Sequence, residues 1–234
     1  MNILLFALFF AAATPADFIQ AVKDQDTVKV RSMLEADPSI ANGKPVTLAL
    51  FHLVNKETFM QPRKNEILQL ILAHHPKLDL WQTAALGTSE DLSKMLKPEL
   101  VNALNEYGWS PLHYAAFAGN VSNVKLLLDR GADMRLRAKT KFRNSPFLAA
   151  MLTGDFDTVK LLLDRGADVL ERQGEGDTAL HEASASGDFP LVKLLVERGS
   201  DLDARDDDGK SPLDYAVQHK HGEVAEFLRA KGVR

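Results

Sequence analysis

The residues of this chain that could do chemistry are 7 histidines and 32 carboxylates, and none of them falls into a catalytic spacing. His181 and Glu182 begin an H-E-x-x-H pattern, but the second histidine is missing. His219 and His221 flank Lys220, a spacing that could hold a metal only weakly. The sequence holds neither a phosphate-binding glycine loop nor a dinucleotide fingerprint. We therefore expect no enzyme activity, no cofactor and no metal.

Residues 201–209, DLDARDDDG, have the composition of a calcium loop but not its register. Such a loop needs glycine at the sixth position and a bidentate glutamate at the twelfth. Counted from Asp201, these positions hold Asp206 and Pro212. We interpret the segment as an acidic turn.

A basic segment has the opposite charge. Cations alternate with other residues at Arg135, Arg137, Lys139, Lys141 and Arg143. In extended backbone this alternation would put successive cations on one face. The segment is either a solvated loop or a finger for an acidic partner surface or an anionic ligand, with charge steering the encounter.

The charged turns belong to a sequence repeat. Its unit ends at Gly131, Gly166, Gly199 and Gly232, so the periods are 35, 33 and 33 residues. The residues that open the first helix of each unit, Pro111, Pro146, Ala179 and Pro212, step by the same intervals. A fixed period of this length indicates a stacked repeat array.

Each unit reads as a pair of helices. Ser110 can cap the first helix and Pro111 suits its first position. Ala115 and Ala116 keep this helix thin, and Gly119 can end it with a left-handed residue. The segment VKLLLDRG that follows predicts a second helix with one apolar stripe. Such a pair buries its apolar face only against neighbouring pairs.

The unit resembles the ankyrin repeat. The family's T-P-L-H-x-A start appears as SPLHYA at 110–115, TALHEA at 178–183 and SPLDYA at 211–216. Its closing segment appears as LLDRGAD at 127–133 and 162–168, and as LLVERGSD at 194–201. Two departures are local: residues 145–148 lack the histidine, and Lys220 replaces the helix-ending glycine of the last unit.

The resemblance implies an all-α solenoid of about seven helix pairs with hairpin-like turns. We expect repeats at 107–139, 140–173 and 174–206 and a capping repeat at 207–234. Residues 14–106 predict degenerate helix pairs at 16–36, 46–73 and 80–96. An unrelated helical domain over 14–106 is the alternative, but no Gly/Ser- or Pro-rich linker separates the halves.

The composition is that of a folded protein, with 45% hydrophobic residues. The net charge of −4 argues against general nucleic-acid affinity, and the lack of cysteine rules out disulfides and thiolate metal sites. We expect a protein partner of unknown identity, no nucleic acid, and a monomer when free.

Residues 3–13 form an unbroken apolar run, shorter than the roughly 20 residues that a spanning helix takes. The run fits a signal peptide over residues 1–13, with cleavage near Ala13. Thr14, Pro15 and Asp17 then read as the start of a helix. No Lys or Arg precedes the run, so an apolar N-terminal helix of a cytoplasmic protein is the alternative. We expect a periplasmic or secreted protein without stable membrane insertion after processing.

Ankyrin proteins bind partners along the turn tips and the exposed side of the first helices, and the resemblance implies the same here. Tyr107, Trp109, Phe117 and Phe142 would anchor the partner, and Arg137, Lys139 and Lys141 would orient it. The same surface would include Asn144, Asp177, Asp208 and Lys210. Trp109 or Phe117 could instead pack against the preceding repeat.

We therefore expect a non-catalytic interaction module that holds a protein. The alternative is an accessory, stabilising or inhibitory subunit of a periplasmic enzyme, similar to an immunity factor. An enzyme grafted on the solenoid lacks convergent catalytic groups, and nucleic-acid binding through the basic turn conflicts with the acidic remainder of the chain.

Overall fold

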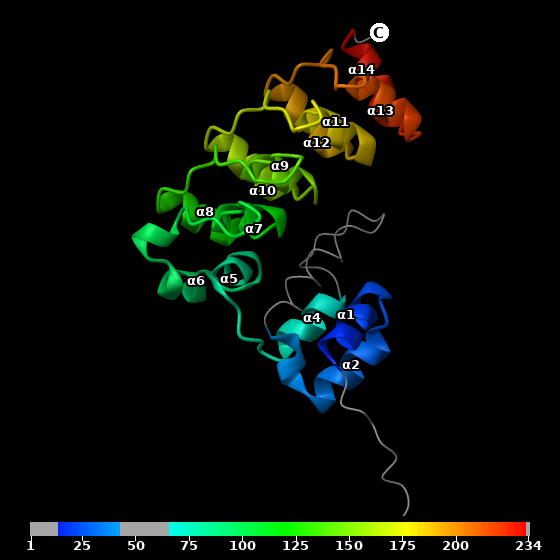
Figure 1. Cartoon of the computed structure of the whole chain (residues 1–234). Coiled ribbons are helices and arrows are strands. Elements are labelled where there is room, and N and C mark those ends of the chain that lie inside the picture. The colour runs from blue at the N-terminus through cyan, green and yellow to red at the C-terminus, as the bar shows by residue number, and fades with distance from the viewer. Residues whose placement is uncertain (1–13, 43–65, 233–234) are drawn as a thin grey trace, which may run out of the picture.

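The computed structural model describes residues 14–42 and 66–232, as helices joined by turns and hairpins (Figure 1). The first part contains α1 Pro15–Lys23, α2 Thr27–Ala36, the 3-10 turn η1 Pro38–Ala41, and α4 Glu66–Ala73. Next come α5 Leu80–Leu86, α6 Ser89–Met95, the 3-10 turn η3 Pro98–Leu100, α7 Pro111–Phe117 and α8 Val121–Asp129. The last are α9 Pro146–Met151, α10 Phe156–Asp164, α11 Ala179–Ser186, α12 Phe189–Glu197, α13 Pro212–Gln218 and α14 Gly222–Ala230. The helix expected at 46–54 and the apolar run at 3–13 lie outside the described residues.

Polar side chains fix where the helices begin. Ser211 accepts a hydrogen bond from the main-chain N–H of Asp214 at 3.2 Å, and Pro212 takes the position where an N–H would lack a partner. The second helices begin in a similar way: Asp155 accepts from the N–H of Thr158 at 2.9 Å. These local bonds are why the short repeat motif is enough to place the helices that carry them.

A left-handed residue separates the two helices of each repeat from α7 to α14. Gly119, Gly154 and Gly187 have φ of 66°, 63° and 71°. In the last repeat the same turn is made by Lys220, with φ of 63°. The departure seen in the sequence therefore changes the residue but not the path of the backbone.

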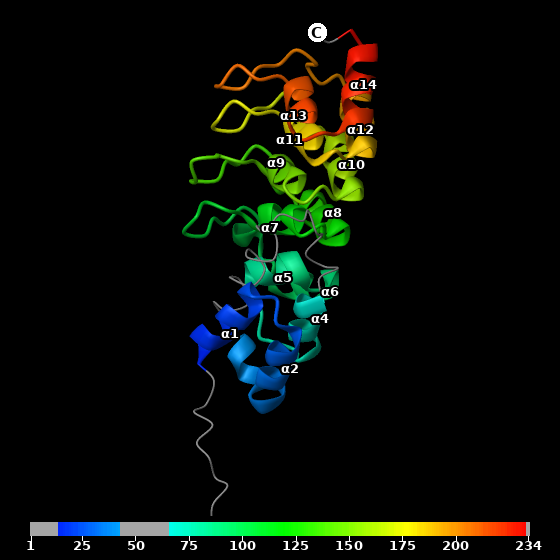
Figure 2. The same ribbon diagram turned by 90° about the vertical axis from the view of Figure 1, so that its right-hand side faces the viewer.

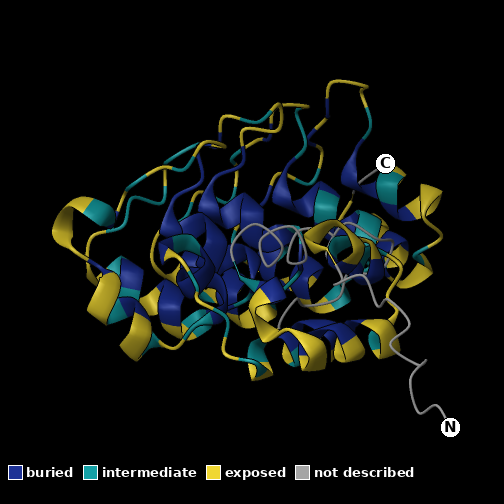
Figure 3. Ribbon diagram, turned by 60° about the horizontal axis from the view of Figure 1, so that its bottom comes forward, coloured by how far each residue is buried: buried dark blue, intermediate teal, exposed yellow. Residues whose placement is uncertain are grey.

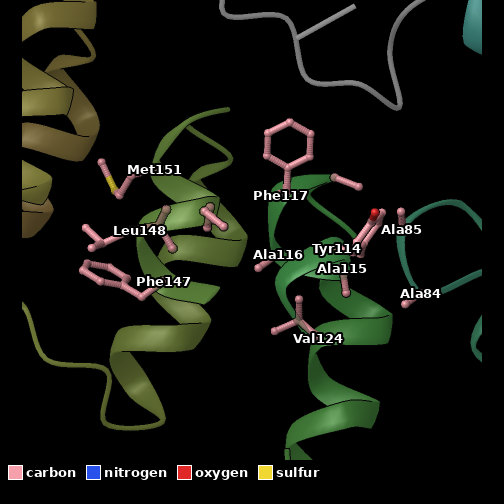
Figure 4. Packing of buried hydrophobic residues seen from close by; sticks show 14 of the residues in the cluster. Ala84, Ala85, Tyr114, Ala115, Ala116, Phe117, Val124, Phe147, Leu148 and Met151 are labelled. Carbon is pink, nitrogen blue, oxygen red and sulfur yellow. The ribbon is translucent and has the colours of Figure 1, made fainter. Parts of the chain in front are cut away.

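The helices stack in two rows. The inner row consists of α5, α7, α9, α11 and α13, and the outer row of α6, α8, α10, α12 and α14. Fully buried alanines, among them Ala84, Ala115, Ala150 and Ala216, let neighbouring inner helices approach closely. Larger buried side chains such as Val124 and Leu148 complete the hydrophobic core (Figure 4). Residues on the stacked faces of the helices are buried, whereas many residues of the hairpins are exposed (dark blue and yellow in Figure 3).

Arginines and aspartates connect the outer helices along the stack. Arg165 Nη1 lies 2.9 Å from Asp129 Oδ1, and Arg198 Nη2 lies 2.6 Å from Asp164 Oδ1. Each pair joins one repeat to the preceding one. Because these groups are partly exposed, each pair contributes at most about 1 kcal/mol to stability.

The predicted all-α solenoid is confirmed for the described residues: six complete helix pairs are present, together with α4. The first helices, α1, α2 and α4, form a group at the lower end of the stack, set to one side of α5 and α6 (Figure 1). Residues 75–79 run from α4 to α5 without helix, and Asn42 Oδ1 accepts a hydrogen bond from Lys77 N at 2.7 Å. No helix of the described part is long and apolar enough to cross a membrane.

Candidate protein-binding surface

Four hairpins project from one edge of the stack, in a row beside the inner helices (Figure 2). Each is closed by a main-chain hydrogen bond across its neck. The bonded pairs are Asn105 N with Trp109 O at 3.1 Å, Ala138 N with Asn144 O at 2.9 Å, Gln173 N with Asp177 O at 2.8 Å, and Asp206 N with Lys210 O at 3.0 Å. We call these hairpins 1 to 4. The second is two residues longer than the others, in keeping with the period of 35 residues at this repeat against 33 at the next two.

Main-chain bonds also join each hairpin to the next. Lys139 N donates to Tyr107 O at 2.9 Å, Gly174 N to Phe142 O at 2.7 Å, and Asp207 N to Glu175 O at 3.2 Å. The row of hairpins is therefore one connected surface.

An arginine ladder, formed by Arg137, Arg172 and Arg205, reinforces this surface. Arg172 Nη1 lies 2.9 Å from Gly176 O in its own hairpin and 2.6 Å from Arg205 O in the next repeat. Arg137 makes the equivalent bonds, at 3.3 Å to Arg143 O and 3.2 Å to Arg172 O. The sequence signal was available, because these arginines are spaced by 35 and 33 residues like the repeat itself.

Arg137 was expected to orient a partner, but its guanidinium is engaged by the scaffold. Besides the two carbonyls, it pairs with Glu171 Oε2 at 3.1 Å, and the Glu171 side chain is 10% exposed. Burial raises the pKa of Glu171, while hydrogen bonding from Ser145 and the charge of Arg137 oppose this rise. The expectation for Arg137 is corrected: it holds hairpin 2 in place and has little capacity left for a partner.

Two histidines at helix starts connect one repeat to the next. His113 Nδ1 faces the N–H of Ser110 at 3.1 Å, and Nε2 faces Asn144 O at 3.1 Å. Since an N–H can only donate and a carbonyl can only accept, the proton is on Nε2. His181 has the same arrangement with Thr178 N and Lys210 O. Both ring nitrogens are thus used by the main chain, which leaves none for a metal or a substrate.

The four aromatic residues expected as anchors divide into two groups. Tyr107 is 52% exposed and Phe142 38% exposed, both at hairpin tips. Trp109 is 7% and Phe117 3% exposed. The ring centroid of Trp109 lies 5.4 Å from that of Phe117 and 5.5 Å from that of Tyr114, in edge-to-face contacts.

The expected role of Trp109 and Phe117 as open anchors is therefore corrected in favour of packing. Their contact lies within one repeat. Figure 4 shows the Phe117 side chain at the end of α7. Asn144 is also buried, at 4% exposed, because its carbonyl closes hairpin 2 and accepts from His113.

The cations of hairpin 2 are not equivalent. Lys141 Nζ lies 2.8 Å from Glu175 Oε1 and 4.4 Å from the centre of the Phe142 ring. Arg135 pairs with Asp133 at 3.2 Å. Lys139 and Arg143 are exposed and have no ion pair among the described residues. Of the five cations expected to contact an acidic partner, Lys139 and Arg143 are therefore available, and Lys141 is partly engaged by Glu175.

Hairpins 3 and 4 are acidic. The hydroxyl of Tyr215 lies 2.9 Å from Asp177 Oδ1 and 2.8 Å from Asp206 Oδ2, so its single proton serves two carboxylates. Burial raises the pKa of Asp177 and of Tyr215. At the tip of hairpin 4, Asp208 is exposed, and Lys210 Nζ donates to Gln218 at 3.2 Å. Charge along the row therefore changes from positive at hairpin 2 to negative at hairpin 4.

Comparison with known proteins agrees with this architecture. The chain matches the family model described as ankyrin repeats, in 3 copies, over residues 18–138 and 147–234. The matched residues include the N-terminal part, where the repeat pattern is weakest. The human protein named DNA-binding protein RFXANK is 30% identical over 129 residues, which are 52% of this chain and 49% of that protein, so the alignment spans about half of each. The motifs, the two helix rows and the family match agree, and the chain belongs to the ankyrin repeat family.

Proposed function

We propose that this chain is a non-catalytic module that binds a protein partner along its hairpin row and the adjoining side of the inner helices. Ankyrin repeats imply protein–protein interaction. The observation that supports this surface is the row of hairpins, which main-chain hydrogen bonds connect into one unit while Tyr107 and Phe142 remain exposed at its tips.

The partner-facing residues follow from exposure. Tyr107 and Phe142 supply apolar contact, Lys139 and Lys141 supply positive charge, and Asp208 and Lys210 lie at the far end of the row. The shape of the hairpins is fixed by residues whose side chains are engaged within the fold: Trp109, Phe117, Asn144, Arg137 and Asp177. Aromatic residues beside cations are typical of the few positions that dominate a protein interface.

Site-specific photo-crosslinking in the native host tests this proposal. A photoreactive phenylalanine analogue replaces Phe142 on the hairpin row or, as the matched control, Phe156 on the outer helix α10, which is also 38% exposed. We expect a discrete protein adduct from position 142 and none from position 156. Equal adducts from both positions, or none from position 142, would reject the hairpin row as the binding surface.

We propose as the alternative an exported accessory, stabilising or inhibitory subunit of a periplasmic enzyme, with the free chain a monomer. Its export is supported at Thr14, whose hydroxyl and main-chain N–H engage Asp17 in a complete capping box for α1. Removal of residues 1–13 would leave this cap intact. Mature protein starting at Thr14, bound to one partner in a fixed ratio, is the expected result. Uncut Met1 would place the protein in the cytoplasm.

A further inference from the structure

We propose that hairpins 1 and 2 recognise an acidic polypeptide segment that also carries an apolar side chain. This inference rests on the proposed function and adds the chemistry of the partner. It arises from two exposed rings and two free cations, one of which is an arginine in an unfavourable backbone conformation.

The exposed rings occupy equivalent positions. Tyr107 and Phe142 each come directly before a residue with positive φ, namely Gly108 at 75° and Arg143 at 50°. The equivalent residues of hairpins 3 and 4 are Glu175 and Asp208. Apolar tips are therefore confined to the first two hairpins. The hydrogen bond from Lys139 N to Tyr107 O holds these two hairpins side by side.

The free cations lie at the same place. A Cβ atom added at Gly108 would come within 2.6 Å of Lys139 Cγ, so the lysine stem runs against the tip of hairpin 1. Arg143 directly follows Phe142. Neither cation has an ion pair among the residues that the structure describes, whereas Arg137 and Lys141 do. Two positive charges thus flank the two exposed rings, ready to meet carboxylates.

Arg143 is the most informative of these residues. The equivalent positions of the other hairpins hold Gly108, Gly176 and Gly209, with φ of 75°, 83° and 79°. Left-handed backbone disfavours any residue with a Cβ atom. The main chain of Arg143 accepts from Arg137 and donates to Thr140, and glycine could do both equally well. What arginine adds is its exposed guanidinium, a planar fork that suits a carboxylate.

The charge along the row favours a polypeptide over a nucleic acid. Glu175, Asp207 and Asp208 directly follow the basic tip and would repel a continuing phosphate backbone. Protein–DNA contacts commonly involve about 6–10 phosphates, and two free cations cannot neutralise so many. A short segment with a few carboxylates and an apolar residue matches the two charges and two rings.

Binding of defined polymers to the full chain tests the inference. The probes are a fluorescent random copolymer of glutamate and tyrosine, poly-glutamate, and duplex DNA, followed by anisotropy. We expect the copolymer to bind more tightly than poly-glutamate, and duplex DNA to be a poor competitor. The variants Lys139→Gln/Arg143→Gly and Tyr107→Ser/Phe142→Ser should each weaken copolymer binding by about tenfold or more.

The control variant Lys125→Gln/Arg229→Gln removes the same charge from exposed positions on the outer helices α8 and α14, and should change affinity less than about twofold. Arg143→Gly alone should weaken binding yet raise Tm by about 2–4 °C, because it removes an unfavourable φ. A loss of affinity that accompanies a higher Tm cannot come from misfolding.

Three results would overturn the inference: no copolymer binding by the wild type, an equal loss in the outer-helix control, or displacement by duplex DNA at equal charge with no effect of the ring substitutions. The last would assign the tip to phosphate recognition. The two proposals fail separately. If the adduct from position 142 survives both Lys139→Gln/Arg143→Gly and Tyr107→Ser, protein binding stands and the acidic-segment chemistry is wrong. If the copolymer binds but position 142 gives no adduct, the acidic-segment chemistry stands and the hairpin row is rejected as the protein-binding surface.

Discussion

The imidazole of His113 and the carbonyl of Asn144 lie 3.1 Å apart, and this contact fastens α7 to the neck of the following hairpin. The ring accepts on one side and donates on the other, so it fits only when neutral. Burial lowers the pKa of His113 to about 4. The contact therefore makes the stability of the array depend on pH.

Stability should fall as pH falls from about 6.5 to 4, because the unfolded chain takes up a proton on His113 in this range while the folded chain does not. The full shift corresponds to about 3 kcal/mol. Urea unfolding of the wild type and His113→Gln at several pH values measures it. The variant should show a shallower pH slope, and an unchanged slope would contradict the assignment.

Substituting Arg172 should loosen the hairpin row. Arg172→Met removes two charge-assisted bonds, to Gly176 O and Arg205 O, and should lower the free energy of unfolding by about 1–2 kcal/mol. Arg135→Met is the control, since the Arg135 side chain is 92% exposed and, among the described residues, pairs with Asp133 alone. If denaturant melts give both variants equal stability, the arginine ladder does not hold the hairpins.

Inner helices should not tolerate a larger side chain at their stacked faces. Ala150 on α9 is fully buried, and Ala150→Leu should destabilise by about 1–3 kcal/mol through overpacking. Ala230→Leu at the exposed end of α14 should change stability by less than about 0.5 kcal/mol. Thermal melts followed by circular dichroism compare the two. Equal Tm values would show that the inner row is loosely packed.

Removing one charge beside Tyr215 should stabilise the acidic end. Because burial raises the pKa of Asp177, its ionised form is disfavoured in the folded state at neutral pH. Asp177→Asn keeps an acceptor for Tyr215 and should gain less than about 1 kcal/mol at pH 7, since solvent screens a half-buried group. The gain should vanish below about pH 4, where the carboxyl is neutral in both states. The exposed Asp208→Asn serves as the control. A gain that persists at low pH would point to a cause other than charge.

Residues along the hairpins show how far prediction from the sequence could go. Ser110 and Pro111 predict where a helix begins, and α7 begins at Pro111 in the structure. Trp109, one residue earlier, was placed at a tip as a possible anchor, and the structure buries its ring. Arg137 looked like one member of a free basic strip, yet its partners Glu171 and Arg172 lie 34 and 35 residues further along the chain. No local pattern shows such contacts.

The sequence by itself determined the repeat, its capped helices, the family and the order of charges along the hairpins. These follow from bonds within a few residues and from a fixed period. Only the tertiary structure decided which charges are free and which rings are open. Stacking brings side chains from neighbouring repeats within hydrogen-bonding distance, so Arg137 is used up in the scaffold while Lys139 and Arg143 remain available.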